Sequence, residues 1–171
     1  LIHIALMGGE GSGALNFGWR DFEPVAGSGE FCLFPMVRRD SGINSVSELL
    51  GIAQSKPDTL IFGANLGAIN HLAGVMLQEL KSGAKFRFVQ IGGGTANYTA
   101  LTGAQTNATV LSGAEVVKFT RLPDGSENPE AQIKPLAYTG PSRFDQLPHL
   151  PTMKELGYDM EFCIKSWWFA P

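Results

Sequence analysis

The sequence predicts an α/β fold in which short strands alternate with helices around a largely parallel sheet. Two observations lead to this prediction. Apolar runs of strand length recur along the chain, and several segments between them carry apolar residues at helical spacing. Glycine makes up 21 of the 171 residues, and many glycines lie in the turns after predicted strands. This alternation is typical of βαβ units whose sheet is covered on both faces.

The first half of the chain holds three predicted strands and two predicted helices. The strands are expected at residues 2–7, 31–38 and 60–63. The first helix begins at Ser45, because Ser45-x-x-Glu48 has the spacing of a capping box, and it ends before Pro57. The second helix is expected at about residues 68–81, where apolar residues recur every three or four positions.

The second half repeats the same alternation with shorter elements. Strands are expected at residues 86–90, 108–111, 133–139 and 160–169. Helices are expected at residues 95–101, 113–119 and 152–156. A polar loop with the turn sequence Pro-Asp-Gly separates the second of these helices from the strand that follows it.

Composition excludes several classes of protein. The formal net charge is −3, so the chain lacks the basic excess of a nucleic-acid binder and we expect no nucleic-acid partner. Apolar residues make up 44% of the sequence, which is too many for an intrinsically disordered chain. No apolar run reaches the roughly 18 residues that a membrane-spanning helix needs.

Both ends of the sequence are apolar and strand-like, which is unusual because natural domain ends are mostly polar. We therefore interpret the chain as a fragment of a longer protein. The cysteines are only two, Cys32 and Cys163, and both lie in apolar strand-like runs. The pattern favours two buried free thiols over the alternative, a bridge between neighbouring strands.

Glycine-rich turns follow three predicted strands, at residues 8–9, 63–65 and 92–94. In an open α/β sheet, ligands bind at the carboxyl ends of strands, where helix N-termini direct free N–H groups and a positive dipole outward. Such turns could therefore hold a carboxylate or a phosphate without a basic side chain. The alternative is that these glycines only form tight turns between strand and helix.

The catalytic and cofactor-binding motifs that this sequence partly matches are each incomplete. Residues 9–14 match a variant of the dinucleotide-binding fingerprint, but an aromatic, turn-like segment follows where the fingerprint requires a helix. No serine lies in a nucleophile elbow, and His3, His71 and His149 are scattered without metal-ligand spacing. We therefore expect no catalytic residue, no metal and no cofactor, and we do not expect an enzyme.

Four stretches carry a resemblance to a known family. They are DFEPVA at residues 21–26, SVSELL at 45–50, FGANLGAINHLAG at 62–74 and RFDQLPHLPTMKELGY at 143–158. In this order they resemble the tripartite tricarboxylate transporter substrate-binding proteins, the Bug or TctC family of periplasmic solute receptors. The last stretch is long and specific, and the resemblance covers nearly the whole chain.

The resemblance implies a type II periplasmic-binding-protein fold in which two lobes close on a small organic carboxylate like a Venus flytrap. It implies that residues 1–20 are a remnant of domain I and the first hinge, that residues 21–165 are domain II, and that 166–171 cross back. A monomer in the periplasm that delivers its ligand to membrane permease subunits is also implied. The implied ligand-binding residues are Gly8, Gly9, Ala64, Asn65, Asn70, His71, Gly93, Gly94 and Thr95.

The sequence departs from the family pattern near these positions. Ile91 and Gly92 replace a tyrosine and a lysine of the family, and Glu10 would repel a carboxylate beside Gly8 and Gly9. The low charge and Ile91 favour a less polar ligand or one with a single acid group. Two alternative functions stay open: a ligand-sensing regulatory domain of the same fold, and a nucleotide-using enzyme.

Overall fold

The computed structural model describes residue 13 and residues 15–170, and it divides the chain into two compact units. Unit 1 combines Leu1–Phe31 with Cys163–Pro171, and unit 2 is Cys32–Phe162. The predicted strand at residues 2–7 lies outside the described residues. No helix in the described part is long and apolar enough to cross a membrane.

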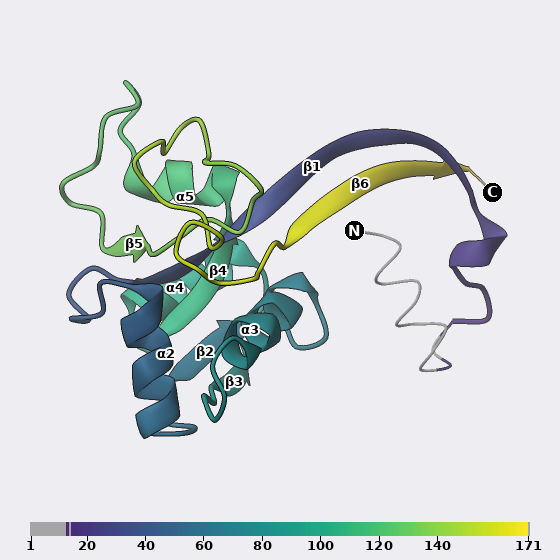
Figure 1. Cartoon of the computed structure of the whole chain (residues 1–171). Coiled ribbons are helices and arrows are strands. Elements are labelled where there is room, and N and C mark those ends of the chain that lie inside the picture. Colours follow the sequence, from purple (N-terminus) through teal and green to yellow (C-terminus); the bar gives the residue numbers. More distant parts are fainter. Residues whose placement is uncertain (1–12, 14, 171) are drawn as a thin grey trace. The chain divides into compact units, whose positions relative to one another are not determined.

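The described elements alternate between strand and helix, as predicted (Figure 1). In chain order they are η1 (Trp19–Asp21), β1 (Glu23–Arg38), α2 (Val46–Ser55), β2 (Ile61–Ala64), α3 (Ile69–Glu79), β3 (Arg87–Gln90), α4 (Gly94–Thr102), β4 (Ala108–Ser112), α5 (Gly113–Thr120), β5 (Ile133–Pro135) and β6 (Cys163–Ala170).

The capping residues predicted for the first long helix do cap α2. The N–H of Glu48 donates to Ser45 Oγ at 3.1 Å, and the N–H of Asn44 donates to the Glu48 carboxylate at 2.6 Å. Two of the free donors at this helix end are thereby satisfied by side chains within four residues of it.

The sheet is mixed, so the prediction of a largely parallel sheet is wrong for part of it. Its strand order is β3-β2-β4-β1-β5, and β6 also pairs with β1. Strand β2 is parallel to β3 and β4, whereas β1 is antiparallel to both β4 and β5. The apolar pattern of a strand reports its burial but not the direction of its neighbour, which explains the error.

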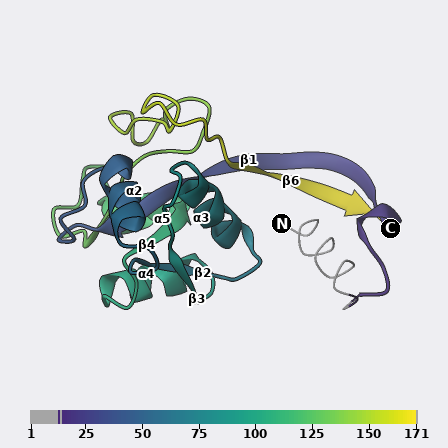
Figure 2. The ribbon, with the colours of Figure 1, turned by 60° about the horizontal axis from the view of Figure 1, so that its bottom comes forward.

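The order of the central strands places helices on both faces of the sheet. Because β3 lies on one side of β2 and β4 on the other, right-handed crossovers put α3 and α4 on opposite faces. Figure 2 shows α3 and α4 on the two sides of these strands. The loops that lead into α3 and α4 follow the carboxyl ends of the parallel strands β2 and β3, so they meet at one edge of the sheet.

The core of unit 2 combines strand and helix residues with the loop after β5. Its fully buried members are Phe34, Met36, Leu101, Leu111, Val116 and Ile133, with Leu147 and Leu150 beside them. The ring of Phe34 stacks on Tyr138 with 4.5 Å between the centroids. Packing is tight beneath α3, where a Cβ on Gly74 would lie 2.7 Å from the rings of both Phe62 and Phe88.

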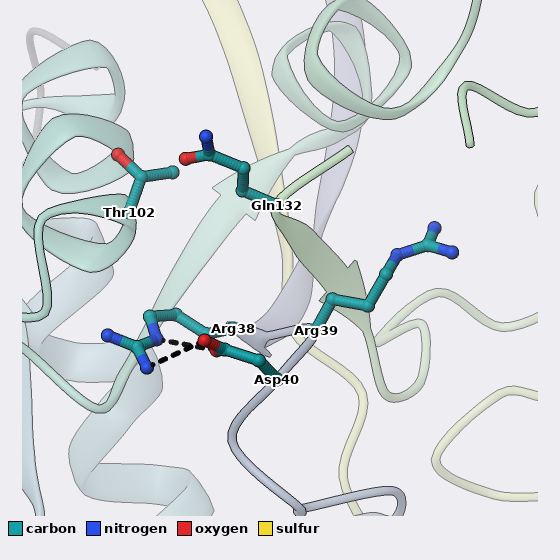
Figure 3. Close-up of a pocket in the computed structure, with 5 residues that line it drawn as sticks. All are labelled: Arg38, Arg39, Asp40, Thr102 and Gln132. Carbon is teal, nitrogen blue, oxygen red and sulfur yellow. Dashed lines mark hydrogen bonds and ion pairs between the residues drawn. The ribbon is translucent and has the colours of Figure 1, made fainter. Parts of the chain in front are cut away.

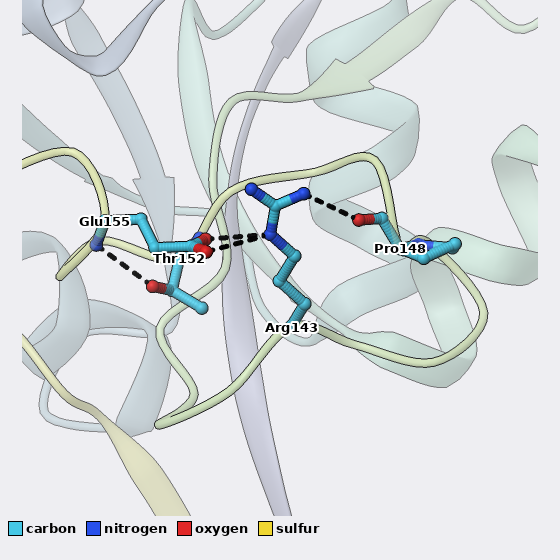
Figure 4. Close-up of polar contacts among 4 residues, drawn as sticks. All are labelled: Arg143, Pro148, Thr152 and Glu155. Atoms are coloured by element: carbon cyan, nitrogen blue, oxygen red, sulfur yellow. Dashed lines mark hydrogen bonds and ion pairs between the residues drawn. The ribbon is translucent and has the colours of Figure 1, made fainter.

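A polar network closes the long loop between β5 and β6 (Figure 4). Arg143 Nε donates to both Glu155 carboxylate oxygens at 3.0 Å, and its Nη1 donates to the carbonyl of Pro148 at 3.0 Å. Thr152 and Glu155 also exchange two hydrogen bonds in the manner of a capping box. The backbone N–H of Thr152, followed by the Arg143 guanidinium, holds the pKa of Glu155 below its usual value.

The helix predicted at residues 152–156 is a hydrogen-bonded turn instead. Gly157 adopts a φ of 84°, which an L residue rarely does, and it ends the segment after one turn. One turn fixes several dihedral angles for very few hydrogen bonds, so an α-helix does not propagate there.

The strands also differ in length from the prediction. Strand β1 begins at Glu23 rather than near residue 31, and β5 ends at Pro135 rather than near 139. Beyond β5 the chain still follows β1, since the N–H of Leu33 donates to Thr139 Oγ1 at 2.8 Å. The N–H of Thr139 donates back to the carbonyl of Leu33 at 3.0 Å, so one backbone bond is kept and the Thr139 hydroxyl accepts the other in place of a carbonyl.

Both cysteines are disulfide-bonded, which corrects the preference for two free thiols.

In unit 1, the side chains of β1 from Glu23 to Glu30 are exposed, as are Trp167 and Trp168 on β6. The described part of unit 1 therefore has an exposed apolar surface, whereas unit 2 has a buried core.

Candidate ligand-binding site

In the loop between β2 and α3, side chains from α3 and β3 accept the hydrogen bonds of three backbone N–H groups. The N–H of Asn65 donates to Asn70 Oδ1 at 3.0 Å, and that of Leu66 donates to Gln90 Oε1 at 2.7 Å. The N–H of Gly67, whose φ is 82°, donates to His71 Nδ1 at 3.1 Å. These three N–H groups are therefore not available to a ligand unless the loop rearranges.

The same side chains tie this loop to the loop between β3 and α4. Asn70 Nδ2 donates to the carbonyl of Gly92 at 3.2 Å, and Gln90 Nε2 donates to Asn65 Oδ1 at 2.9 Å. The carbonyl of Ala64 accepts from the N–H of Ile91 at 2.7 Å. The predicted residues of the two loops are thus held next to each other, although they are more than 20 residues apart in sequence.

The predicted side chains of the first loop keep part of their bonding capacity. Because His71 Nδ1 accepts a hydrogen bond, the proton of the neutral ring lies on Nε2. This half-buried ring makes a T-shaped contact with the ring of Phe88, with 4.8 Å between centroids. Asn65 uses its Oδ1 within the loop, so its Nδ2 is the donor that it can offer to a ligand.

The second loop leaves its helix N-terminus open. Gly93 is the N-cap of α4, and Gly94 and Thr95 form its first turn, where no described side chain caps the backbone N–H groups. Asn97 is fully buried beneath this turn, and its Nδ2 donates to the carbonyls of Gly92 and Gly93 at 2.7 and 3.0 Å. The loop is therefore fixed through its carbonyls, while its donors stay free for an anion.

A carboxylate of the protein itself lies against this helix end. Glu115, in the first turn of α5, accepts from the N–H and the Oγ of Ser112 at 2.9 and 2.8 Å. A Cβ on Gly94 would overlap the Glu115 carboxylate, so the absence of a side chain at Gly94 makes room for it. Glu115 thus places a negative charge beside the positive end of the α4 dipole.

The structure brings together seven of the predicted ligand-binding residues: Ala64, Asn65, Asn70, His71, Gly93, Gly94 and Thr95. Gly8, Gly9 and the neighbouring Glu10 lie outside the described residues. Sequence reasoning missed the contributions of Gln90, Asn97 and Glu115. Of these, only Glu115 had a readable signal, the Ser112-x-x-Glu115 spacing of a capping box.

Two pockets of about 450 Å³ each lie at the other edge of the sheet, near the end of β1. One is lined by Arg38, Arg39, Asp40, Thr102 and Gln132 (Figure 3). Arg38 Nε and Nη2 both donate to the Asp40 carboxylate, at 2.8 and 3.0 Å, so its charge is already balanced. We regard the α3 and α4 loops as the stronger candidate site because the α4 loop offers free backbone donors and the α3 loop offers side-chain donors beside them.

Comparison with known proteins found no family model that matches the chain. A curated relative, Protein BugT of Bordetella pertussis, is 27% identical over 151 residues, which cover 88% of this chain and 43% of BugT. A crystal structure of a TctC solute-binding protein from Polaromonas matches 95% of this chain and 54% of its own, with 25% identity and a TM-score of 0.73.

Two further structures match in the same way. The periplasmic binding protein BugD is 26% identical with a TM-score of 0.74, over 88% of this chain and 48% of BugD. A protein of R. palustris, solved with adipate, is 25% identical with a TM-score of 0.69, over 87% of this chain and 46% of its own.

The fold and the two joined loops therefore define the chain as an α/β lobe of the type found in periplasmic binding proteins, as the sequence predicted. The resemblance to the Bug/TctC family of tripartite tricarboxylate transporter substrate-binding proteins is likewise confirmed. The chain spans about half the length of these relatives, and the relatives are binding proteins rather than enzymes.

Proposed function

We propose that this chain is part of a periplasmic solute receptor that binds a small organic carboxylate and delivers it to the permease subunits of a tripartite tricarboxylate-type transporter. Binding would close two lobes on the ligand without covalent chemistry, so the protein would not be an enzyme. The observation that carries the proposal is the joined pair of loops at the carboxyl ends of β2 and β3. The adipate bound to the R. palustris relative supports a carboxylate as the ligand.

In this proposal residues 21–165 form domain II, and residues 1–20 and 166–171 lead from and to domain I. A ligand carboxylate would accept hydrogen bonds from the free N–H groups of Gly94 and Thr95, where the helix dipole favours a negative charge. Asn65 Nδ2 and His71 Nε2 would donate to the ligand from the first loop. The dipole and neutral donors would then hold the anion, which suits a loop pair without lysine or arginine.

The charge of Glu115 narrows the class of ligand. It lies beside the helix end that would bind one carboxylate, so a second carboxylate on the same side of the ligand would be repelled. We therefore propose a ligand with a single acid group near α4 and a neutral or less polar remainder. This agrees with the expectation drawn from Ile91, which replaces a tyrosine of the family.

Thermal denaturation of the full-length protein against organic acids, amino acids and amides tests the proposal. A ligand at 100 times its Kd should add about 2.7 kcal/mol and raise the midpoint clearly. The Asn70→Ala variant, which separates the two loops, should lose that shift, and the exposed amide variant Gln54→Ala should keep it. No shift with any acid, together with a shift by nicotinamide or adenine nucleotides, would overturn the proposal.

A further inference from the structure

A further pocket with several charged lining residues lies in unit 2 at the end of β1, away from the α3 and α4 loops. It measures about 190 Å³, and its charged lining residues are Arg39, Arg121, Glu127 and Lys134, with His149 also in the lining. The buried side chains of Leu147 and Leu150 contribute apolar lining. The pocket is small enough that only a compact group can enter it.

This pocket concentrates positive charge in a chain whose formal net charge is −3. Arg39, Arg121 and Lys134 carry three permanent positive charges, and Glu127 supplies the single carboxylate of the lining. Two positive charges therefore remain without a balancing carboxylate within the pocket.

The hydrogen bonds of these cations do not remove the imbalance. Arg39 Nη2 pairs with Glu127 at 2.8 Å, and Lys134 Nζ donates to the neutral amide oxygen of Asn44 at 2.6 Å. Arg121 Nη2 makes a long contact of 3.4 Å with the carbonyl of Gln146, and Arg121 Nε is buried without an acceptor in the described part of the chain. A buried guanidinium N–H without an acceptor is costly, so an incoming acceptor would be favoured.

The behaviour of Glu127 agrees with this positive field. Its hydrogen bond to Arg39, followed by the charges of Arg39, Arg121 and His149, holds the pKa of Glu127 below its usual value. The neighbouring Arg38 does not line this pocket and is paired with Asp40. Figure 3 shows the Arg39 guanidinium directed away from that pair.

The pocket is also separate from the proposed organic-acid site. Val37, near the end of β1, pairs with Ala108 at the start of β4, and Arg38 pairs with Ile133 at the start of β5. The α3 and α4 loops instead follow the carboxyl ends of β2 and β3, which run parallel to β4. The two sites therefore lie at opposite edges of the sheet.

We propose that the pocket formed by Arg39, Arg121 and Lys134 binds a compact, doubly charged oxyanion such as inorganic phosphate. Guanidinium groups bind such oxyanions with paired, charge-assisted hydrogen bonds. Two negative charges would balance the two uncompensated cations, and an oxygen atom would supply the acceptor that Arg121 Nε lacks.

Calorimetric titration of the full-length protein with inorganic phosphate, at constant ionic strength set with sodium chloride, tests this site. We expect saturable binding of one phosphate, and binding at least about tenfold weaker in Arg121→Gln and in Lys134→Gln, since each removes one charge-assisted contact. Arg121→Lys should retain part of the affinity. Lys85→Gln, which removes an exposed lysine on the α3–β3 connection, is the matched control and should bind as the wild type does.

Binding no stronger than that of chloride, or equal in the wild type and in both Gln variants, would overturn the proposal. Displacement of phosphate by an organic acid would also overturn it, because the ion would then belong to the α3 and α4 loops. The thermal shift by organic acids should be unchanged in Arg121→Gln and Lys134→Gln. If organic acids produce no thermal shift in the wild type, the result counts against the receptor function and not against the phosphate site.

Discussion

The loop before α3 and the loop before α4 lie side by side, but they use their polar groups in opposite ways. In the α3 loop, side chains from Asn70, Gln90 and His71 accept the hydrogen bonds of three successive backbone N–H groups. In the α4 loop, Asn97 binds carbonyls, and the N–H groups of the first helical turn stay uncapped by described side chains. The backbone N–H groups of the α3 loop are therefore already bonded within the protein, whereas those at the start of α4 can bind an anion.

This difference assigns separate roles to neighbouring residues of the same site. The α3 loop is held in place by its hydrogen bonds, so little conformational entropy would be lost when a ligand binds to it. It also presents its side-chain donors at fixed positions. The uncapped N-terminus of α4 can attract an anion through the helix dipole. The nearby negative charge of Glu115 limits how much negative charge a ligand can carry there. Three substitutions and one pH titration test this division, beginning with the substitution that should cost the most stability.

Removal of the Asn70 amide should have the largest effect, because it loosens both loops. Asn70→Ala removes two accepted hydrogen bonds and the one donated to Gly92, so we expect about 1–3 kcal/mol of lost stability in urea unfolding. Gln54→Ala, which removes a single exposed hydrogen bond, should cost less than about 0.5 kcal/mol. Equal costs for the two variants would show that the α3 loop is not closed by Asn70.

A side chain at Gly94 should disturb α4 through Glu115. Gly94→Ala must displace the Glu115 carboxylate and so break the capping box at Ser112, for an expected loss of about 0.5–2 kcal/mol. Gly93→Ala is the matched control, since a Cβ there meets nothing within 4 Å and φ is −78°. Thermal unfolding of both variants measures the difference, and a stable Gly94→Ala protein would contradict the close contact.

Neutralising Glu115 should change affinity more than stability. Glu115→Gln keeps the length of the side chain and removes the charge beside the α4 terminus. A carboxylate ligand should therefore bind about two- to fivefold more tightly, which corresponds to about 0.4–1 kcal/mol. Glu79→Gln, which removes an exposed acid at the far end of α3, should leave the affinity unchanged. Titration calorimetry distinguishes the two, and weaker binding in Glu115→Gln would show that Glu115 itself contacts the ligand.

Acid should affect the loop closed by Arg143 and Glu155 and spare the α3 loop bonds made by Asn70 and Gln90, which are amides and do not titrate. The folded-state pKa of Glu155 is lowered, so its stabilising contribution is present above the usual carboxyl value of 4.5 and is lost as pH falls through the lower folded value. Hydrogen exchange of the Thr152 amide across this window should report the change. In Arg143→Gln this loss of protection should occur at higher pH. If its pH midpoint is unchanged, the ion pair between Arg143 and Glu155 is not what lowers the pKa of Glu155.

Several local features were predictable because the residues that make them are close in sequence. Ser45 and Glu48 mark the start of α2 three residues apart, and the glycines at 63 and 92–94 mark the ends of β2 and β3. The prediction of a helix at residues 152–156 is wrong. Thr152 and Glu155 form a capping pattern like that of Ser45 and Glu48, but around a single turn. A capping motif indicates where a helix can begin, but not whether enough residues follow to propagate it.

The alternation of strands and helices, the glycine turns of the candidate site and the family resemblance were all predictable from the sequence. These follow from periodicity, capping and motifs, which act over a few neighbouring residues. Packing between distant elements, in contrast, decided that β1 is antiparallel, that both cysteines are bonded and that Gln90 binds a loop residue 24 positions before it. It also decided that Glu115 lies against Gly94. Such contacts join residues far apart in the chain, and only the packing of elements against one another brings them within hydrogen-bonding distance.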